Sequence, residues 1–354
     1  MSKVVRVLVV DDSAYNRRTI IKMLESIPGV EVAGYACDGE EGLRKVFDLK
    51  PDLVTLDLEM PRMDGFTFLR IVMQSRPTPV IVVSARSENE SVFRALEFGA
   101  VEFVAKPSAR ITPELFNIRD DLVRKVREIA GTDMSKVVDR AKVVVHGSPE
   151  PGSAVVRTPV RESARISQVV IGSSTGGPPA LQAIFSAIQR PYPIGFAISQ
   201  HMPSGFTKAF ADRLNKFCHL EIVEAKTGDI MEPGRVLISP GGKNLVFRKR
   251  GTQVVAHVVD PLPDQRYIPS VDAMFSSASE VFGANLLGVV LTGMGNDGAR
   301  GIVDVKGRGG ETLAESEESS VVFGMPKEAI ATGKVDRVLP LSRMCGEILS
   351  RCGY

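Results

Sequence analysis

The sequence predicts two α/β domains with doubly wound parallel sheets, joined by a linker. Three observations support this fold class. Short apolar runs alternate with amphipathic helical patterns over residues 1–128. Residues 129–166 are rich in turn-forming residues, which is typical of a linker. A second α/β series occupies residues 167–354, with a mostly parallel sheet and one antiparallel hairpin expected.

The first domain is predicted to contain five short strands. They span Val4–Val10, Glu31–Tyr35, Asp52–Leu56, Pro79–Val83 and Val101–Val104. Helical patterns lie between them, for example over Ala14–Ser26, Glu40–Leu49 and Gly65–Gln74. Near-continuous apolar strands between amphipathic helices are typical of a parallel sheet that is covered on both faces.

The second domain follows the linker, whose most turn-rich part is residues 147–153. Its predicted strands are Val169–Ile171, Ile194–Ser199, Val236–Ile238, Leu245–Arg248, Val254–Val258 and Leu286–Leu291. Its predicted helices are Leu181–Ile188, Gly205–Phe217 and Val271–Phe282. The segment Gln253–Val258 follows Gly251 and is expected to form the second arm of a hairpin, so we expect a mixed sheet.

Composition excludes several classes of protein. The 354 residues carry a formal net charge of +2, which does not favour a nucleic-acid partner. No stretch approaches the roughly 18 consecutive apolar residues of a membrane span. The four cysteines show no CxxC spacing and are expected to be free thiols; they are Cys37, Cys218, Cys345 and Cys352. We therefore expect a cytoplasmic protein without membrane insertion.

Polar side chains follow several strands of the first domain where those strands end. Asp11 and Asp12 follow the first strand, Asp57 the third, Ser84 the fourth and Lys106 the fifth. Because the carboxyl ends of parallel strands share one edge of the sheet, we expect these groups to converge. Three carboxylates suit Mg²⁺, and a hydroxyl and an ammonium beside them suit a phosphoryl group on a carboxylate. Solvated strand-end charges are the alternative, which their recurrence at matching strand ends disfavours.

Residues 1–128 resemble a response-regulator receiver domain, which has a flavodoxin-like fold. The matching pieces are Asp11-Asp12, Leu56–Pro61, Asp64-Gly65, Ser84-Ala85 and Gly99-Ala100 with Phe103 and Lys106-Pro107. The resemblance implies that Asp57 accepts a phosphoryl group from a histidine kinase. It implies Mg²⁺ on Asp12, Asp57 and the Glu59 carbonyl, with Asp11 acting through water. It also implies a switch hydroxyl at Ser84, a switch aromatic at Phe103, a phosphoryl partner at Lys106 and a cis peptide at Lys106-Pro107.

The second domain carries its most informative motif at Gly172–Gly177, Gly-Ser-Ser-Thr-Gly-Gly. The motif lies between a strand and a helical pattern, and Ser174 has a glycine two places away on either side. This is the nucleophile-elbow pattern, in which glycines allow a tight turn that lifts one hydroxyl above the sheet edge. Serine acyl chemistry is one interpretation. A plain strand-to-helix turn and a phosphate cradle are the others.

A serine nucleophile needs a base, and the base needs an orienting carboxylate. Of the four histidines, His201 directly follows an apolar strand and therefore lies at the same sheet edge as Ser174. Asp297 also follows an apolar strand, within Leu291–Gly298, and is the candidate carboxylate. The backbone N–H groups of Met294 and Thr175 are candidates for binding an oxyanion.

Two other functions fit parts of the same sequence. Gly293–Gly298 matches the G-x-G-x-x-G motif of a dinucleotide-binding enzyme, with Glu315 or Glu317 about 20 residues further on. Two observations weigh against this dinucleotide-binding interpretation. The strand before the motif comes late in the domain rather than first, and the carboxylate of Asp297 would face the pyrophosphate. A receiver-controlled transcriptional regulator would need a basic recognition helix, whereas residues 168–354 indicate an α/β domain with little net charge.

Several segments together resemble the effector domain of the chemotaxis protein-glutamate methylesterases. They are Ile171–Gly177, Gln200–Pro203, Pro269–Asp272, Leu291–Gly298 and Ser319–Pro326. The resemblance spans about residues 168–352 and follows the receiver in the order usual for that family. It implies hydrolysis of glutamyl 5-O-methyl esters on chemoreceptor cytoplasmic domains with release of methanol, and deamidation of certain glutamines. It implies no cofactor for the esterase reaction.

By motif position, the resemblance makes Ser174 the nucleophile, His201 the base and Asp297 its orienting partner, with the Met294 N–H holding the oxyanion. Four positions depart from the family pattern, namely Ser173, Ile268, Glu315 and Ser316. The departures at Ile268 and Glu315 leave the receptor preference open. We also expect autoinhibition, in which the unphosphorylated receiver covers the Ser174 cleft and phosphorylation of Asp57 releases it.

Overall fold

The computed structural model describes residues 4–85, 89–106, 118–130 and 166–354. The chain divides into two compact units, Met1–Gly147 and Ser148–Tyr354, which we call the N-terminal and the C-terminal unit. The predicted linker, residues 129–166, lies almost wholly outside the described residues. Its predicted boundaries therefore stay predictions.

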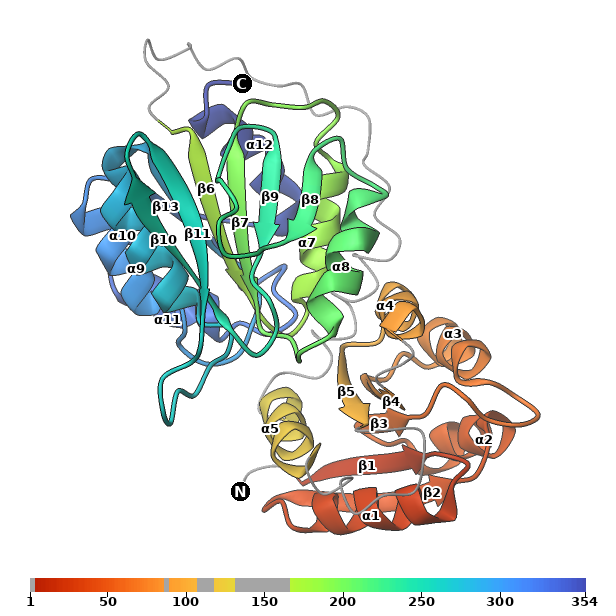
Figure 1. Ribbon diagram of the computed structural model, residues 1–354. Coiled ribbons are helices and arrows are strands. Elements are labelled where there is room, and N and C mark those ends of the chain that lie inside the picture. The colour runs from red at the N-terminus through yellow and green to blue at the C-terminus, as the bar shows by residue number, and fades with distance from the viewer. Residues whose placement is uncertain (1–3, 86–88, 107–117, 131–165) are drawn as a thin grey trace. The chain divides into compact units, whose positions relative to one another are not determined.

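The N-terminal unit contains a five-stranded parallel sheet in the order β2-β1-β3-β4-β5 (Figure 1). Its strands are β1 (Val5–Val10), β2 (Val30–Ala36), β3 (Leu53–Leu56), β4 (Val80–Ala85) and β5 (Glu102–Lys106). Its helices are α1 (Ala14–Glu25), α2 (Gly39–Leu49), α3 (Gly65–Ser75), α4 (Asn89–Glu97) and α5 (Arg119–Ala130). All five predicted strands are present, within two residues of the expected bounds.

Polar residues cap the N-termini of three of these helices. Ser13, Asp38 and Asp64 each accept the backbone N–H three residues further along, which satisfies an otherwise unpaired helix donor. Gly65 lies so close to the end of β3 that a Cβ there would come within 2.4 Å of the Asp57 carbonyl. The start of α3 is therefore packed directly against Asp57.

The C-terminal unit contains a seven-stranded sheet in the order β14-β13-β12-β6-β7-β9-β8, parallel throughout. Its strands are β6 (Gln168–Ser173), β7 (Gly195–Gln200), β8 (Glu221–Glu224), β9 (Arg235–Ile238), β12 (Leu286–Val290), β13 (Glu311–Glu315) and β14 (Arg337–Leu339). Strands β8, β13 and β14 are not predicted from the sequence. Strands β8 and β14 are short edge strands with few buried residues, and β13 begins and ends with glutamate, so none has a clear apolar pattern.

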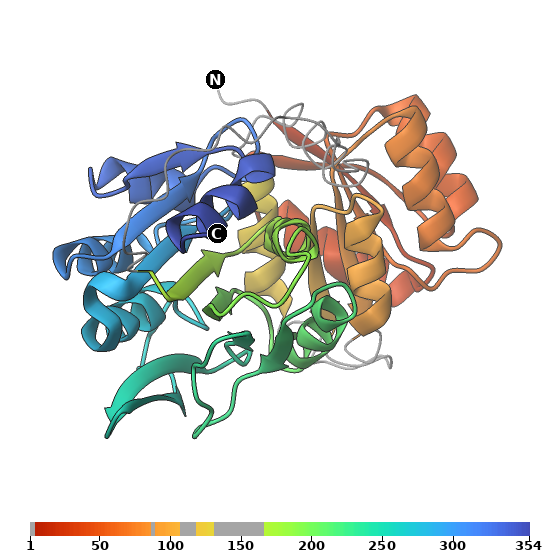
Figure 2. The ribbon, with the colours of Figure 1, turned by 90° about the horizontal axis from the view of Figure 1, so that it is seen from above.

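The predicted hairpin is present as β10 (Asn244–Arg250) and β11 (Gln253–Val259). It does not join the main sheet, contrary to the expectation of a mixed sheet. Figures 1 and 2 show it (teal) as a separate two-stranded ribbon. Leu245, Phe247 and Ala256 of the hairpin belong to the same buried cluster as Met274 and Phe275 of the following helix, so burial against that helix holds the hairpin.

The helices of this unit are α7 (Gly177–Ser186), α8 (Phe206–Asn215), α9 (Val271–Phe282), α10 (Ala299–Gly307), α11 (Met325–Ala331) and α12 (Leu341–Arg351). Helices α7 and α8 pack together, and α9 packs on α10 (Figure 1). The chain passes from β6 to β7 on one side, whereas β12 pairs with β6 on the other side. Ligand sites of doubly wound sheets lie at the carboxyl ends of the strands at such a switch point.

The cysteines and the lengths of the helices can also be compared with the predictions. All four cysteines are free thiols, as predicted. In the described part of the chain, no helix is both long enough and apolar enough to cross a membrane.

Candidate active site

Ser174 lies in the turn between β6 and α7 and is 3% exposed. Its backbone N–H donates to the Thr292 carbonyl (3.0 Å), and its carbonyl accepts the Gly177 N–H (2.8 Å). Gly176 has a φ of +77°, and a Cβ there would come within 2.6 Å of Val321. A side chain does not fit at that position, which explains why the motif has a glycine there.

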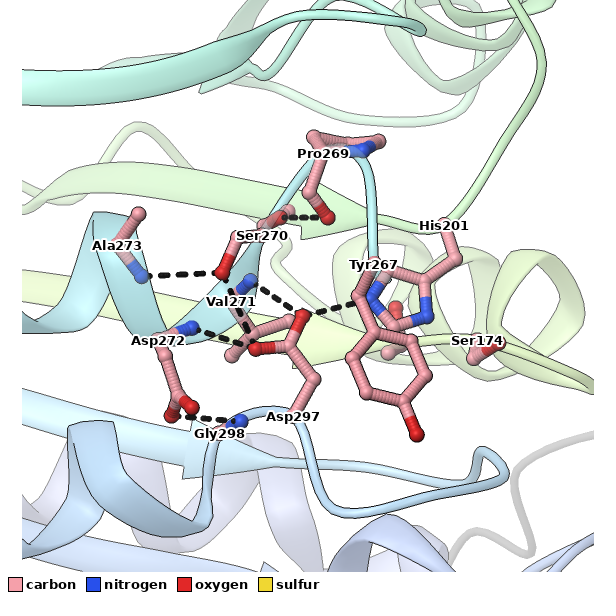
Figure 3. A network of polar contacts seen from close by, with 12 residues as sticks. Ser174, His201, Tyr267, Pro269, Ser270, Val271, Asp272, Ala273, Asp297 and Gly298 are labelled. Atoms are coloured by element: carbon pink, nitrogen blue, oxygen red, sulfur yellow. Dashed lines mark hydrogen bonds and ion pairs between the residues drawn. The ribbon is translucent and has the colours of Figure 1, made fainter. Parts of the chain in front are cut away.

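His201 follows β7, the neighbour of β6. The sheet register pairs Ser173 with Gln200, and the His201 N–H donates to the Ser173 carbonyl (3.1 Å), so His201 and Ser174 emerge side by side. His201 Nε2 makes a 2.8 Å hydrogen bond with Asp297 Oδ2. The other ring nitrogen lies on the side of Ser174 (Figure 3). The imidazole is therefore placed between a hydroxyl and a carboxylate, as a general base requires.

Between Ser174 and His201, both within the described residues, no side-chain hydrogen bond is drawn (Figure 3). In enzymes without substrate, such bonds are often long and tighten when substrate binds. The Gln200 side chain connects the two turns instead. It accepts from Ser173 Oγ (2.7 Å) and donates to the carbonyls of Ser174 (3.0 Å) and His201 (3.1 Å).

Asp297 is 2% exposed and follows β12. Besides His201, it accepts the backbone N–H groups of Val271 (2.7 Å) and Asp272 (2.9 Å) and the Ser270 hydroxyl (3.2 Å), as Figure 3 shows. Val271 and Asp272 form the first turn of α9, where the helix dipole favours a negative charge. Strands β12, β6 and β7 are neighbours, so Asp297, Ser174 and His201 come from three adjacent strand ends.

Two backbone N–H groups next to Ser174 are available for a developing oxyanion. In the described part of the chain, neither the Thr175 N–H nor the Met294 N–H donates a backbone hydrogen bond. The Thr292 hydroxyl donates to the Thr175 carbonyl (2.9 Å), which holds the two turns together. At Gly293, a Cβ would come within 2.7 Å of the Ser174 Cβ, so the turn that carries Met294 lies against the turn that carries Ser174.

The N-terminal unit has a second candidate site at the strand ends predicted from the sequence. Carboxylate oxygens of Asp11, Asp12 and Asp57 lie within 4.8 Å of one another. Lys106 Nζ donates to Asp11 (3.0 Å) and to Asp57 (2.6 Å). Three hard-oxygen donors at this spacing fit Mg²⁺, and the ammonium is near enough to neutralise part of an added phosphoryl charge.

Burial and neighbouring charges shift the ionisation of this cluster. Burial raises the pKa of Asp11 from 3.8 to about 6; Lys106 opposes the shift and Asp57 adds to it. Burial disfavours the charged form of Lys106, but Asp11 and Asp57 outweigh it and raise the pKa of that ammonium. Ionised Asp11 is therefore held in the folded state at a cost in stability, whereas the charge of Lys106 is favoured there.

The other sequence-predicted receiver residues lie on neighbouring elements. Ser84 is fully buried in β4, and Phe103 is 2% exposed in β5. Glu59, whose carbonyl is the candidate ligand, follows β3 and has an exposed side chain. The predicted cis peptide at Lys106-Pro107 involves a residue outside the described ones.

Sequence profiles of two families match the chain, one over each unit. The profile for the CheB methylesterase matches residues 169–348, and that for the response regulator receiver domain matches residues 7–114. The protein-glutamate methylesterase/protein-glutamine glutaminase 3 of Geobacter sulfurreducens is 58% identical, covering 99% of this chain and 98% of its own length. The chain belongs to the CheB methylesterase family.

Other CheB methylesterases agree with this result. The protein-glutamate methylesterase/protein-glutamine glutaminase 1 of Myxococcus xanthus is 48% identical, over 96% of this chain and 94% of its own. The crystal structure of the Thermotoga maritima CheB methylesterase catalytic domain is 38% identical, with a TM-score of 0.51. It covers 52% of this chain and 97% of that domain. The predicted fold class, family and enzyme class are thereby confirmed.

Glu315 is one of the two acidic residues that the dinucleotide alternative would use. It is fully buried, and its carboxylate accepts the Thr292 N–H (2.8 Å) and the Ser319 hydroxyl (2.8 Å). A carboxylate held in these hydrogen bonds is not available to bind a ribose. In this CheB methylesterase, Glu315 instead supports the turn that carries Met294.

Two residues next to the candidate triad escaped the sequence analysis as site residues. Gln200 connects the two turns, and its place directly before His201 was the available signal. The Tyr267 ring stacks on His201, with ring centroids 5.2 Å apart (Figure 3). No local pattern marks Tyr267, because it reaches the site only through the packing of the segment between β11 and α9.

Proposed function

We propose that the chain hydrolyses glutamyl 5-O-methyl esters on chemoreceptor cytoplasmic domains, releasing methanol, and deamidates certain glutamines there. Its membership of the CheB methylesterase family supports this. The observation that carries it is the alignment of three adjacent strand ends, with His201 bonded to buried Asp297 at 2.8 Å and facing Ser174. The site of action is then the cytoplasm, because the substrate domains are cytoplasmic.

The reaction is a two-step acyl transfer. Ser174 Oγ attacks the ester carbonyl carbon, and its proton passes to the His201 nitrogen that is not bonded to Asp297. The C–O bond of the ester then breaks, and His201 returns the proton to the departing methanol. Water attacks the acyl-serine with His201 again as base, which regenerates Ser174 and leaves glutamate. With glutamine as substrate, ammonia takes the place of methanol.

The backbone N–H groups of Met294 and Thr175 stabilise the negative oxygen of the tetrahedral intermediate. They belong to two turns that Thr292 holds together through its hydroxyl. Fixed donors of this kind need no rearrangement as charge develops, which is why they lower the barrier. The esterase step itself is proposed to need no cofactor.

Phosphorylation of Asp57 by a histidine kinase is proposed to control this activity. Asp12, Asp57 and the Glu59 carbonyl would hold Mg²⁺, with Asp11 acting through water. Bound there, Mg²⁺ supplies positive charge to the incoming phosphoryl group. Lys106 and Ser84 would contact that group, and Phe103 would respond to it as the switch aromatic. Changing a two-state ratio from 1:99 to 99:1 requires about 5.5 kcal/mol of differential interaction, which a doubly charged group can supply.

Methanol release from methyl-esterified chemoreceptor tests the esterase. Wild type is expected to release methanol, and Ser174→Ala is expected to release none while keeping its fold. Ser186→Ala is the matched control, because Ser186 is an exposed serine at the end of α7. Methanol release by Ser174→Ala at the wild-type rate would contradict the nucleophile assignment.

Acetyl phosphate with Mg²⁺ tests the coupling. Wild type is expected to be activated, and Asp57→Asn is expected not to respond. Asp48→Asn changes an exposed carboxylate of α2 and is expected to respond like wild type. An Asp57→Asn protein that responds as strongly as wild type would refute control through Asp57.

A further inference from the structure

The ring of Tyr267 stacks on the imidazole of His201. The ring centroids are 5.2 Å apart and the planes differ by 6°, and Figure 3 shows the phenol ring beside the face of the imidazole. Two parallel rings at this separation form an offset stack, which is a favourable aromatic arrangement. Tyr267 lies between β11 and α9, on a different segment from Ser174, His201 and Asp297.

A single hydrogen bond does not fix the plane of the imidazole. Asp297 holds one atom, His201 Nε2, at 2.8 Å. The ring can still tilt about its Cβ–Cγ torsion, because that torsion has broad energy wells in histidine. A rigid ring parallel to one face limits the tilt, and it keeps the second nitrogen on the side of Ser174 (Figure 3).

The backbone around Tyr267 is itself fixed by a pair of side-chain amides. Gln265 and Asn244 exchange two hydrogen bonds, of 2.8 and 3.0 Å. Gln265 also donates to the Tyr267 carbonyl (2.7 Å), and Asn244 accepts the Ser270 N–H (2.9 Å). Asn244 begins β10 and Ser270 caps α9, so Tyr267 is tied to both the hairpin and the helix. It can therefore act as a firm support for another ring.

The Tyr267 hydroxyl points at the turn that carries Met294. A Cβ on Gly295 would come within 2.2 Å of the hydroxyl oxygen, so glycine leaves room for it. The hydroxyl oxygen is buried and has no hydrogen-bond partner among the described residues. Removing it would break no bond that the structure contains, whereas removing the ring would take away the support under His201.

We propose that Tyr267 is a positioning residue for His201, and that its ring rather than its hydroxyl holds the imidazole plane between Asp297 and Ser174. The inference rests on the proposed function in taking His201 as the base. It extends that function to a residue outside every motif that identifies the triad.

The test compares Tyr267→Leu with Tyr267→Phe in the full-length chain, activated by acetyl phosphate and Mg²⁺. Methanol release from methyl-esterified chemoreceptor yields kcat and KM. Tyr267→Leu is expected to lower kcat by about 10- to 100-fold, because misplacing a catalytic group has an effect of this size. Its KM is expected to change by less than about threefold. Tyr267→Phe keeps the ring, so its kcat is expected to stay within about threefold of wild type.

Tyr192 offers a matched control in the same unit. Its ring packs on Tyr354, with centroids 5.0 Å apart, and the Arg190 guanidinium lies 4.7 Å from its centroid. Tyr192→Leu therefore also loses an aromatic contact and is expected to keep the wild-type kcat. Thermal unfolding of each variant shows that it is folded. Should Tyr267→Leu not fold, Tyr267→Met takes its place, because methionine adapts to irregular space and also lacks a ring.

A folded Tyr267→Leu enzyme with the wild-type kcat would overturn the proposal. A Tyr267→Phe enzyme with a kcat as low as that of Tyr267→Leu would also overturn it, because the hydroxyl and not the ring would then be the group that positions His201. Ser174→Ala in the same assay separates this inference from the proposed function. Turnover by Ser174→Ala refutes the triad, whereas inactive Ser174→Ala beside fully active Tyr267→Leu refutes the role of Tyr267 alone.

Discussion

The oxygen of Asp297 that bonds to His201 also accepts the backbone N–H of Val271, the first residue of α9, at 2.7 Å. Asp272 and Ser270 bond to the other oxygen of the same carboxylate. The charge of a buried carboxylate is thus balanced by a helix N-terminus. The residue proposed to orient the base therefore also joins the end of β12 to α9.

Asp297→Asn is expected to reduce both turnover and stability. Its amide NH₂ must face at least one of the N–H or O–H groups that now donate to the carboxylate, which loses a hydrogen bond. We expect a loss of about 10⁴-fold in kcat and of about 1–3 kcal/mol in the free energy of unfolding. Methanol release and urea unfolding measure the two effects. Asp212→Asn, at an exposed carboxylate of α8, is the control. A loss of stability with unchanged kcat would mean that Asp297 stabilises the N-terminus of α9 but does not orient His201 for catalysis.

Glu315→Ala is expected to destabilise the C-terminal unit. It leaves the Thr292 N–H and the Ser319 hydroxyl without their buried acceptor, which costs about 2–4 kcal/mol in the free energy of unfolding. Since Thr292 lies two residues before Met294, kcat should fall more than KM rises. Glu317→Ala, at an exposed position, is expected to stay within about 0.5 kcal/mol of wild type. Unchanged stability of Glu315→Ala would contradict this structural role.

Gly293→Ala is expected to impair catalysis through the backbone. A Cβ there would come within 2.4 Å of Met325 Sδ and 2.7 Å of Ser174 Cβ. The turn that carries Ser174 must shift to make room, and kcat should fall by about 100-fold. Gly307→Ala is the matched control, because nothing lies within 4 Å of a Cβ at that position. Normal methanol release by Gly293→Ala would mean that the Ser174 turn tolerates displacement.

Asp11→Asn is expected to stabilise the N-terminal unit at neutral pH when Mg²⁺ is removed by EDTA. Burial raises the pKa of Asp11 to about 6 in the folded state, against 3.8 for the ordinary group. The folded state thus binds the proton more tightly than the unfolded state, and the ionised carboxylate lowers stability above about pH 6. The neutral asparagine avoids this destabilisation. We expect it to raise the free energy of unfolding by about 1–2 kcal/mol.

This gain should be largest above pH 6 and shrink as the pH falls toward 4, where Asp11 is protonated in the folded state. Urea unfolding at pH 7.5 and pH 4.5 measures it, with Asp48→Asn as an exposed control. A gain that increases on acidification would have the opposite sign and would contradict the raised pKa.

Much of the fold follows from local pattern. Strands such as β1, β6 and β12 are apolar runs that end at polar residues, so their positions and the residues at their carboxyl ends are visible in the sequence. Edge strands such as β8 and β14 bury few residues, and their short segments carry no such pattern. The hairpin was predictable as a pair of strands. Its separation from the main sheet was not, because that depends on its packing against α9.

The sequence by itself determined most of the segments that form strands, and it determined that Ser174, His201 and Asp297 each follow such a segment. It could do so because burial and turn preferences act over a few residues. Only the tertiary structure decided that the Tyr267 ring stacks on His201, that Glu315 is buried and accepts the Thr292 N–H, and that the N-terminus of α9 donates to Asp297. These contacts join segments far apart in the chain, and they depend on which buried surfaces meet when the whole unit packs.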